Sequence, residues 1–231
     1  MSSQPNQSLI DGLSCLQMLA SSRKPVGSRE LARSLALDNM RANRLLKTLA
    51  DIGLAQQDSK KKYSIGPGIH ALTAQSLYGS RVLKQTLPLI QELPYRGITV
   101  ALGVLWRGHV TYLYHGEIGE SIEKGIGRIG LIPALNSSVG KLLLSFEEDI
   151  HIEELRVSSE RNHPKVPLFK EIKNIRKNGY AEIRPEGGGV SLAIPIGEPP
   201  VMGLALAGVP ADESVEPYLK SLKAIRAQIT L

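Results

Sequence analysis

The sequence has a single cysteine, Cys15, among its 231 residues. One thiol cannot form an internal disulfide, and it excludes a zinc site that is built from several thiolates. Such sparse use of cysteine is typical of proteins that stay in a reducing compartment. The first residues, Met1 to Ser8, are polar and lack the basic-then-apolar order of a signal peptide. Together these absences predict a cytoplasmic location.

Long apolar runs and enzyme motifs are also lacking. No stretch approaches the roughly 18 apolar residues of a membrane-spanning helix, so we expect no contact with a membrane. The five histidines show no zinc-type pairing with nearby acids, and there is no Gly-x-Ser-x-Gly and no phosphate-binding loop motif. We therefore expect no catalytic residue, no metal site and no cofactor, and we interpret Cys15 as a core residue.

Positive charge is concentrated in the first third of the chain. Residues 1–66 contain ten Lys and Arg against five Asp and Glu, a net charge of +5, whereas the remainder has a net charge of +1. A small basic module beside a nearly neutral larger one favours a polyanion as the partner of the first. A merely well-solvated surface is the alternative interpretation.

Three short helices are predicted before residue 53. The first covers residues 8–21, and the second covers residues 28–35. The third begins after Asp38, a good N-cap residue, and ends before Gly53. The residues expected on the buried face of the first helix are Leu9, Leu13, Leu16 and Ala20. Those expected on the buried face of the third are Leu45, Leu46, Leu49 and Ile52.

Two short strands follow, at residues 54–57 and 63–65, with a polar turn between them. The turn carries Lys60, Lys61 and Lys62. Three helices with a tight connection between the second and third, followed by a basic hairpin, are typical of a winged helix-turn-helix. Residues 1–66 are therefore predicted to form such a DNA-binding domain.

The rest of the chain is predicted to form a linker helix and a second domain. Residues 67–82 are interpreted as the linker, whose apolar positions have no small core nearby and are expected to contact a second subunit. In residues 83–231 the pattern changes to strands at 98–104 and 110–114 around a turn at 107–109, and mixed helices and strands follow. This mixture predicts an α+β domain for effector binding and oligomerisation.

Five segments, in the same order, resemble the IclR family of bacterial regulators. Residues 44–54 resemble its recognition helix, and residues 63–67 its end-of-wing motif. The segments of the second domain that resemble the family are residues 131–141, 179–181 and 193–196. The resemblance implies a winged helix-turn-helix followed by a GAF-like effector-binding domain, a homodimer or dimer of dimers, and a palindromic double-stranded DNA operator.

The sequence departs from the family pattern at its expected ligand pocket. Ser191 stands where many members have a cysteine, and Ala205 and Ala207 stand where members with small polar acid effectors have serines. The histidine that is usual in the segment 131–141 is absent, with Leu135 or Asn136 in its place. These departures indicate a less polar pocket, and they favour a larger or partly aromatic effector, or none, over glyoxylate or pyruvate.

DNA contacts are expected from the N-terminal half of the third helix, because that end of a recognition helix enters the major groove. Arg41 and Asn43 are the preferred base readers, since Arg pairs with guanine and Asn with adenine. Arg44 and Lys47 are assigned to phosphates, with an ion pair from Arg44 to an acid such as Asp11 or Glu30 as the alternative. An ordinary solvated helix face is the alternative for all of them. The full set of candidates is Ser28, Arg29, Asn39, Met40, Arg41, Asn43, Arg44, Lys47, Lys60, Lys61 and Lys62.

Effector contacts are expected from a glycine-rich stretch, residues 125–130, from a helix start at 136–138, and from a facing strand. Backbone N–H groups at a helix start bind anions without special side chains. Glu182 and Glu186 are expected in a loop over the pocket. Turns and helix caps explain the glycines and serines equally well. The candidates are Gly127, Arg128, Ile129, Asn136, Ser137, Ser138, Glu182, Ser191, Ala205 and Ala207.

The favoured hypothesis is a sequence-specific DNA-binding regulator. A small-molecule effector would shift the arrangement of the dimer's domains and thereby the spacing of its two recognition helices. A winged-helix adaptor that contacts proteins without an effector response is the alternative, and the clustered charge argues against it. An enzyme built on the second domain would need a catalytic constellation that the sequence lacks.

Overall fold

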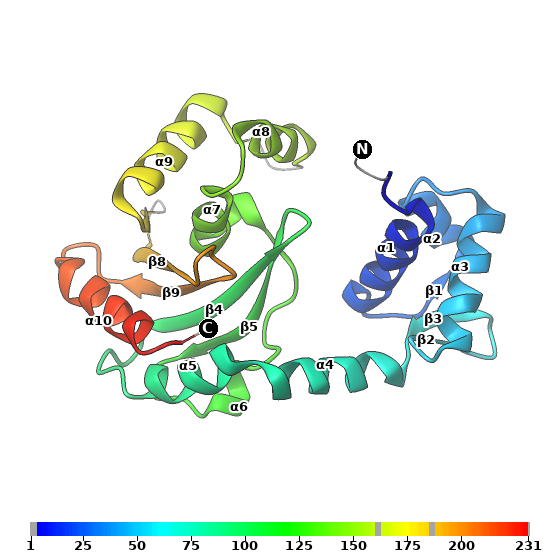
Figure 1. Ribbon diagram of the computed structural model, residues 1–231, viewed down its shortest axis with the longest axis horizontal. Helices are drawn as coiled ribbons and strands as arrows, with labels where there is room; N and C mark the ends of the chain where they lie inside the picture. Colours follow the sequence, from blue (N-terminus) through cyan, green and yellow to red (C-terminus); the bar gives the residue numbers. More distant parts are fainter. Residues whose placement is uncertain (1–3, 160–162, 185–187, 231) are drawn as a thin grey trace. The chain divides into compact units, whose positions relative to one another are not determined.

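The computed structural model describes residues 4–159, 163–184 and 188–230 (Figure 1). The chain divides into two compact units, Met1–Ser80 and Arg81–Leu231. Among the described residues, no helix has the length and apolar character that crossing a membrane requires.

The first unit consists of helices around a small sheet. Its helices are α1 (Gln7–Ser21), α2 (Ser28–Ser34), α3 (Asn39–Asp51) and α4 (Pro67–Gly79). Its strands are β1 (Val26–Gly27), β2 (Ala55–Gln57) and β3 (Lys62–Ile65). The strands form an antiparallel sheet in the order β1-β3-β2. The predicted three helices and hairpin are confirmed, and β1 is an additional strand between the first two helices, where the sequence predicts no element.

Two expectations about burial in this unit are wrong. The buried residues of α1 are Asp11, Cys15 and Leu19, whereas Leu9 and Leu13 are 62% and 41% exposed. Hydropathy favours the leucine face because the other face carries a carboxylate, but Asp11 is neutralised by an ion pair and can be buried. Ile52 is also exposed, because α3 ends at Asp51 and the chain leaves the helix there.

Helix α4 has no buried residue within the chain. It begins with Pro67, a residue that suits the first turn of a helix. Its large apolar side chains, Leu72, Leu77 and Tyr78, are exposed. This helix therefore gains little stability from packing against its own unit.

The second unit is built on a six-stranded antiparallel sheet in the order β6-β5-β4-β9-β8-β7. Its strands are β4 (Thr99–Trp106), β5 (His109–Glu117), β6 (Ile132–Pro133), β7 (Ala181–Ile183), β8 (Val190–Ile196) and β9 (Met202–Val209). Its helices are α5 (Arg81–Gln91), α6 (Ile122–Gly125), the 3-10 turn η1 (Ala134–Asn136), α7 (Ser138–Leu144), α8 (Asp149–Ser158), α9 (Lys165–Asn178) and α10 (Glu216–Ala227).

Each face of this sheet carries its own core. On one face, Leu102, Leu192 and Leu206 pack against residues of α5 and α10. On the other face, Ala101, Ala193 and Ala205 pack against residues of α7 and α9. Figure 1 shows these helix pairs on opposite sides of the strands. Neighbouring residues of a strand point to opposite faces of the sheet. The leucines therefore lie in the core beside α5 and α10, and the alanines lie in the core beside α7 and α9.

The hairpin between β4 and β5 has the turn that the sequence predicts. Arg107 and Gly108 have φ values of 50° and 77°. Positive φ at both central residues is the geometry of a type I′ turn, which matches the twist of the two strands. A Cβ atom on Gly108 would lie 2.5 Å from Leu155 Cδ2, so a larger residue would also require the Leu155 side chain to move. β4 continues to Trp106 and β5 starts at His109, so both strands reach closer to the turn than the sequence predicts.

Candidate nucleic-acid interface and effector cavity

The start of α3 is held by Asp38, as predicted. Its carboxylate accepts hydrogen bonds from the backbone N–H groups of Met40, at 2.9 Å, and Arg41, at 3.0 Å. This cap satisfies two N–H groups that a helix start leaves without partners. The cap also fixes the residue at which α3 begins. The exposed face of α3 carries Asn39, Met40, Arg44 and Lys47, while Asn43 is half-buried.

Arg41 lies in a different environment from the other basic residues of α3. Its Nη2 atom is 2.7 Å from Asp11 Oδ2 in α1, and Gln7 Nε2 donates to the other carboxylate oxygen at 2.8 Å. The Asp11 side chain is only 10% exposed. The ion pair to Asp11 that was considered for Arg44 is thus formed by Arg41. Arg44 is exposed and forms no ion pair with the described residues.

Asp58 shapes the tip of the β2–β3 hairpin. Its Oδ1 atom accepts hydrogen bonds from the N–H groups of Lys60, at 2.9 Å, and Lys62, at 2.8 Å. Lys61 takes a positive φ of 58° to complete the turn. All three lysine side chains are exposed, so the hairpin presents a compact group of cations. At the start of α2, Arg29 is exposed and Ser28 is half-buried.

A cavity of about 360 Å³ in the second unit brings together four predicted effector residues. They are Asn136, Ser137, Ser138 and Ser191. The same cavity is lined by three basic side chains that sequence reasoning missed, Lys141, His163 and Arg184. Lys141 could have been found, because it lies three residues after Ser138 and hence about one helical turn further along α7. Its ammonium group forms an ion pair with Glu171 of α9.

Two small residues at the start of α7 have structural roles. Ser137 is the N-cap, and its hydroxyl accepts from Gly140 N at 3.1 Å and hydrogen-bonds with the Tyr112 hydroxyl at 2.8 Å. A Cβ atom on Gly140 would lie 2.1 Å from Ala134 O, so only glycine permits this approach of α7 to η1. Burial raises the pKa of Tyr112, which keeps its phenol protonated. The hydroxyl groups of Ser138 and Ser191 have no such capping role.

The other predicted effector residues do not line this cavity. Gly127, Arg128 and Ile129 follow α6, and Arg128 pairs with Glu120 at 3.0 Å. Glu182 pairs with Arg184, and it precedes Ile183, which does line the cavity, so the two point to opposite faces of β7. The two alanines, Ala205 and Ala207, lie in β9, where Ala205 is buried in the core. Glu186 lies outside the described residues.

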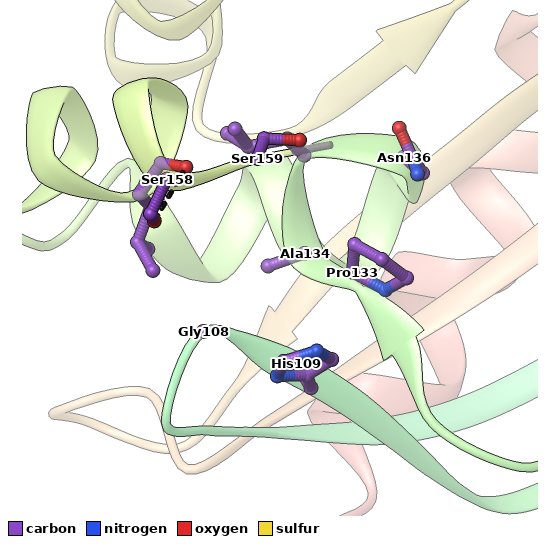
Figure 2. Close-up of a pocket in the computed structure, with 9 residues that line it drawn as sticks. Gly108, His109, Pro133, Ala134, Asn136, Ser158 and Ser159 are labelled. Atoms are coloured by element: carbon purple, nitrogen blue, oxygen red, sulfur yellow. Dashed lines mark hydrogen bonds between the residues drawn. The ribbon is translucent and has the colours of Figure 1, made fainter. Parts of the chain in front are cut away.

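A second cavity, of about 400 Å³, lies between the β4–β5 hairpin and α8 (Figure 2). Figure 2 shows His109 on the hairpin side and Ser158 and Ser159 on the side of α8. Asn136 lines this cavity as well as the first. Within the described ranges, no three His, Cys, Asp or Glu side chains are grouped so that they could hold a metal ion.

Comparisons with known proteins place these features in a family. Residues 8–59 match the model of the IclR helix-turn-helix domain. The Glycerol operon regulatory protein of Streptomyces coelicolor is 26% identical over 213 residues, which cover 88% of this chain and 84% of that protein. Residues 8–59 thus carry the helix-turn-helix domain of the IclR family, and the chain as a whole is similar to an IclR-type regulator. The resemblance that the sequence motifs indicate is thereby confirmed.

Solved structures of IclR proteins share the fold along nearly the whole chain. An IclR family transcriptional regulator from Brucella abortus has 24% identity and a TM-score of 0.77, with 98% of this chain and 92% of that chain covered. An IclR homolog from Microbacterium hydrocarbonoxydans, complexed with 4-hydroxybenzoate, has 22% identity and a TM-score of 0.62, with 96% and 97% covered. The predicted α+β class, with an N-terminal helix-turn-helix and a GAF-like C-terminal domain, is confirmed.

Proposed function

We propose that this IclR-family protein binds a specific DNA operator through α3 and the β2–β3 hairpin, and that a small molecule bound in the second unit modulates this affinity. The observation that carries the proposal is the set of exposed cations on these two elements that form no ion pair within the part of the chain that the structure describes. They are Arg44, Lys47, Lys60, Lys61 and Lys62. Cations that are free of protein partners can neutralise phosphates and release counterions.

A homodimer, or a dimer of dimers, follows from the exposed apolar side chains of the first unit. Isolated helices of this length are marginal in water, and most helices in proteins are stabilised by packing of an apolar face. Helix α4 has no fully buried residue, and Leu9 and Leu13 of α1 are exposed. A second copy of the chain would cover these residues, and two recognition helices related by symmetry would read a palindromic operator.

The cavity lined by Ser138, Lys141 and Ser191 supports a small effector. Its volume of about 360 Å³ lies at the lower end of the usual range for ligand pockets. Lys141 is paired with Glu171, which also lines the cavity, and Arg184 is paired with Glu182, whereas Ser138 and Ser191 provide hydroxyl groups, so we propose an effector that carries a hydroxyl or other hydrogen-bonding group. The Microbacterium relative holds 4-hydroxybenzoate, and the Streptomyces relative is named for a glycerol operon. The protein would act in the cytoplasm, where bacterial DNA lies.

The test has two stages. First, the full chain is used to select binders from a library of random DNA duplexes, and the affinity for the selected duplex is measured by fluorescence anisotropy over a range of salt concentrations. We expect a palindromic preference and an affinity that falls steeply with salt. A chain without sequence preference or salt-sensitive affinity would overturn DNA reading and favour the adaptor alternative.

Second, glycerol, 4-hydroxybenzoate and related hydroxy acids are titrated into the complex with the selected duplex. We expect one class to change the duplex affinity of the wild-type chain. The Ser191→Leu variant, in which a larger apolar side chain fills part of the cavity, should bind the duplex normally and lose the response. A response that persists unchanged in this variant would show that the effector binds elsewhere.

A further inference from the structure

We infer that Asp11 and Arg41 form a clamp that positions the recognition helix against α1, and that Arg44, not Arg41, reads a base. The inference rests on the proposed DNA binding by α3. It reverses the roles that the sequence alone suggests for the two arginines, and it adds Asp11, which lies 30 residues away, as a positioning residue for DNA recognition.

The geometry of Asp11 indicates a structural ion pair. Both of its carboxylate oxygens have partners, Gln7 from the same helix and Arg41 from α3. Its side chain is almost completely removed from water. One turn further along α1, burial and the negative charge of Asp11 raise the pKa of the Cys15 thiol to about 11, as expected when a carboxylate lies close by in a poorly hydrated region. Loss of Arg41 would leave a buried charge without its partner, which is strongly unfavourable.

The guanidinium of Arg41 is poorly placed for base reading. A bidentate contact with guanine requires two N–H donors that point at the base. In Arg41 the Nη2 atom contacts Asp11, and the Nε atom is buried without a hydrogen-bond partner. To offer its Nε/Nη edge to DNA, the side chain would have to move, and any use of the Nη1/Nη2 edge is restricted by the contact of Nη2 with Asp11. Arg41 is therefore held as a link between two helices.

Arg44 has the properties that Arg41 lacks. It lies three residues further along α3, about one turn away and still in the N-terminal half of the helix. Its side chain is exposed, and it forms no ion pair with the described residues. Its five donors are available, so it can make the bidentate contact with guanine that is the commonest specific contact of arginine in the major groove. Lys47 continues the same exposed surface and suits a phosphate.

The experiment compares conservative variants of the full-length chain in the duplex selection. Arg44→Lys keeps the charge but removes the bidentate fork, so we expect it to lose discrimination at one base pair of each half-site, by about tenfold. Arg41→Lys should keep the wild-type base preference and bind the selected duplex within about threefold, since a lysine can still pair with Asp11. Arg23→Lys, at an exposed arginine before β1, is the matched control and should change neither.

Asp11→Asn tests the positioning role directly. We expect it to weaken binding to the selected duplex about tenfold and to leave binding to an unselected duplex within about twofold, because phosphate contacts carry no sequence information. The overall discrimination falls, but the preferred base at each position of the half-site should stay the same. Asp11→Leu/Arg41→Leu removes both charges together, which buried pairs often tolerate. This double variant keeps the assignment testable if Asp11→Asn does not fold, and it should retain the wild-type base preference.

Opposite outcomes overturn the assignment. If Arg41→Lys or the double variant loses a base preference while Arg44→Lys retains all of them, Arg41 is the reader and the clamp is wrong, although DNA recognition stands. If Asp11→Asn binds the selected duplex as tightly as the wild type, Asp11 has no positioning role. If the wild-type chain selects no sequence, the proposed function fails and the assignment of Arg44 fails with it.

Discussion

The two units differ in what their basic side chains contact. Among residues 4–80, ion pairing is confined to Asp11 and Arg41, and the remaining lysines and arginines are exposed. In the second unit, by contrast, Lys141, Arg156 and Arg176 each form an ion pair with an acidic side chain of the same unit. The comparison teaches that net charge alone does not identify a polyanion-binding surface. Cations without protein partners that are grouped on the recognition helix and hairpin of a helix-turn-helix are better candidates, because they are available to a ligand and lie where DNA would bind.

Arg176 illustrates the structural use of a cation in the second unit. From α9 it donates to the backbone carbonyls of Ser145 and Glu147, at 2.8 Å each, and its Nη1 atom lies 2.7 Å from Asp149. It thus ties α9 to the chain between α7 and α8. Such an arginine has no free edge for a phosphate.

The largest expected effect is a loss of stability in the first unit that leaves the second unit unchanged. Leu46 is completely buried in the core of the first unit. Leu46→Ala should lower the free energy of unfolding of that unit by about 2–5 kcal/mol, through lost burial and a residual cavity. Differential scanning calorimetry should show one transition shifted to lower temperature and the transition of the second unit unchanged. Met40→Ala, at a residue that is 83% exposed, is the control and should shift neither. If both transitions move with Leu46→Ala, the units do not unfold independently.

The next prediction tests whether the lysines of the β2–β3 hairpin contact DNA phosphates. Replacing Lys60, Lys61 and Lys62 by Gln should reduce the slope of log affinity against log salt by about 0.9 for each phosphate contact that is lost. The matched control replaces Lys170, Lys173 and Lys177, three exposed lysines of α9, by Gln. This control removes the same charge and should leave the slope unchanged. Equal slopes for the two triple variants would contradict phosphate contact by the hairpin.

A smaller effect on stability is expected for Arg176, which links α9 to the chain between α7 and α8. Arg176→Met leaves the carbonyls of Ser145 and Glu147 without a donor, and should cost about 1–2 kcal/mol of unfolding free energy in the second unit. The partial exposure of Arg176 lets water replace some of the lost hydrogen bonds, which keeps the cost modest. Chemical denaturation followed by circular dichroism measures it. Lys177→Met, at the next residue, should cost much less, and equal losses would argue against the tie.

The last effect appears only at alkaline pH and concerns Cys15. Burial, followed by the charge of Asp11, raises the thiol pKa from 9.0 to about 11. A group whose pKa is raised by folding stabilises the folded state below its unfolded pKa and loses that contribution as pH rises through the folded value. The unfolding free energy of the wild-type chain should therefore fall relative to Cys15→Ala between pH 9 and pH 11. A difference between the two that stays constant over this range would contradict the raised pKa.

The candidate sites were only partly predictable, because local patterns do not show which distant residues meet. In the first unit, the spacing of apolar residues predicts three helices and a hairpin, but it selects the wrong face of α1. The correct face contains Asp11, and its burial depends on Arg41, which lies 30 residues later. In the second unit, Ser138 and Ser191 were predicted correctly as neighbours of one cavity, while Lys141 and Arg184 were missed.

The sequence by itself determined the resemblance to the IclR family, the three helices and hairpin of the first unit, the basic character of that unit and the turn after β4, since these depend on short-range periodicity, caps and backbone preferences. Only the tertiary structure decided which arginine of α3 is paired, that Ala205 lies in a core, and that Glu182 points away from the cavity. The physical reason is that burial and ion pairing depend on contacts between segments far apart in the chain, and strand register then determines the face on which each side chain lies.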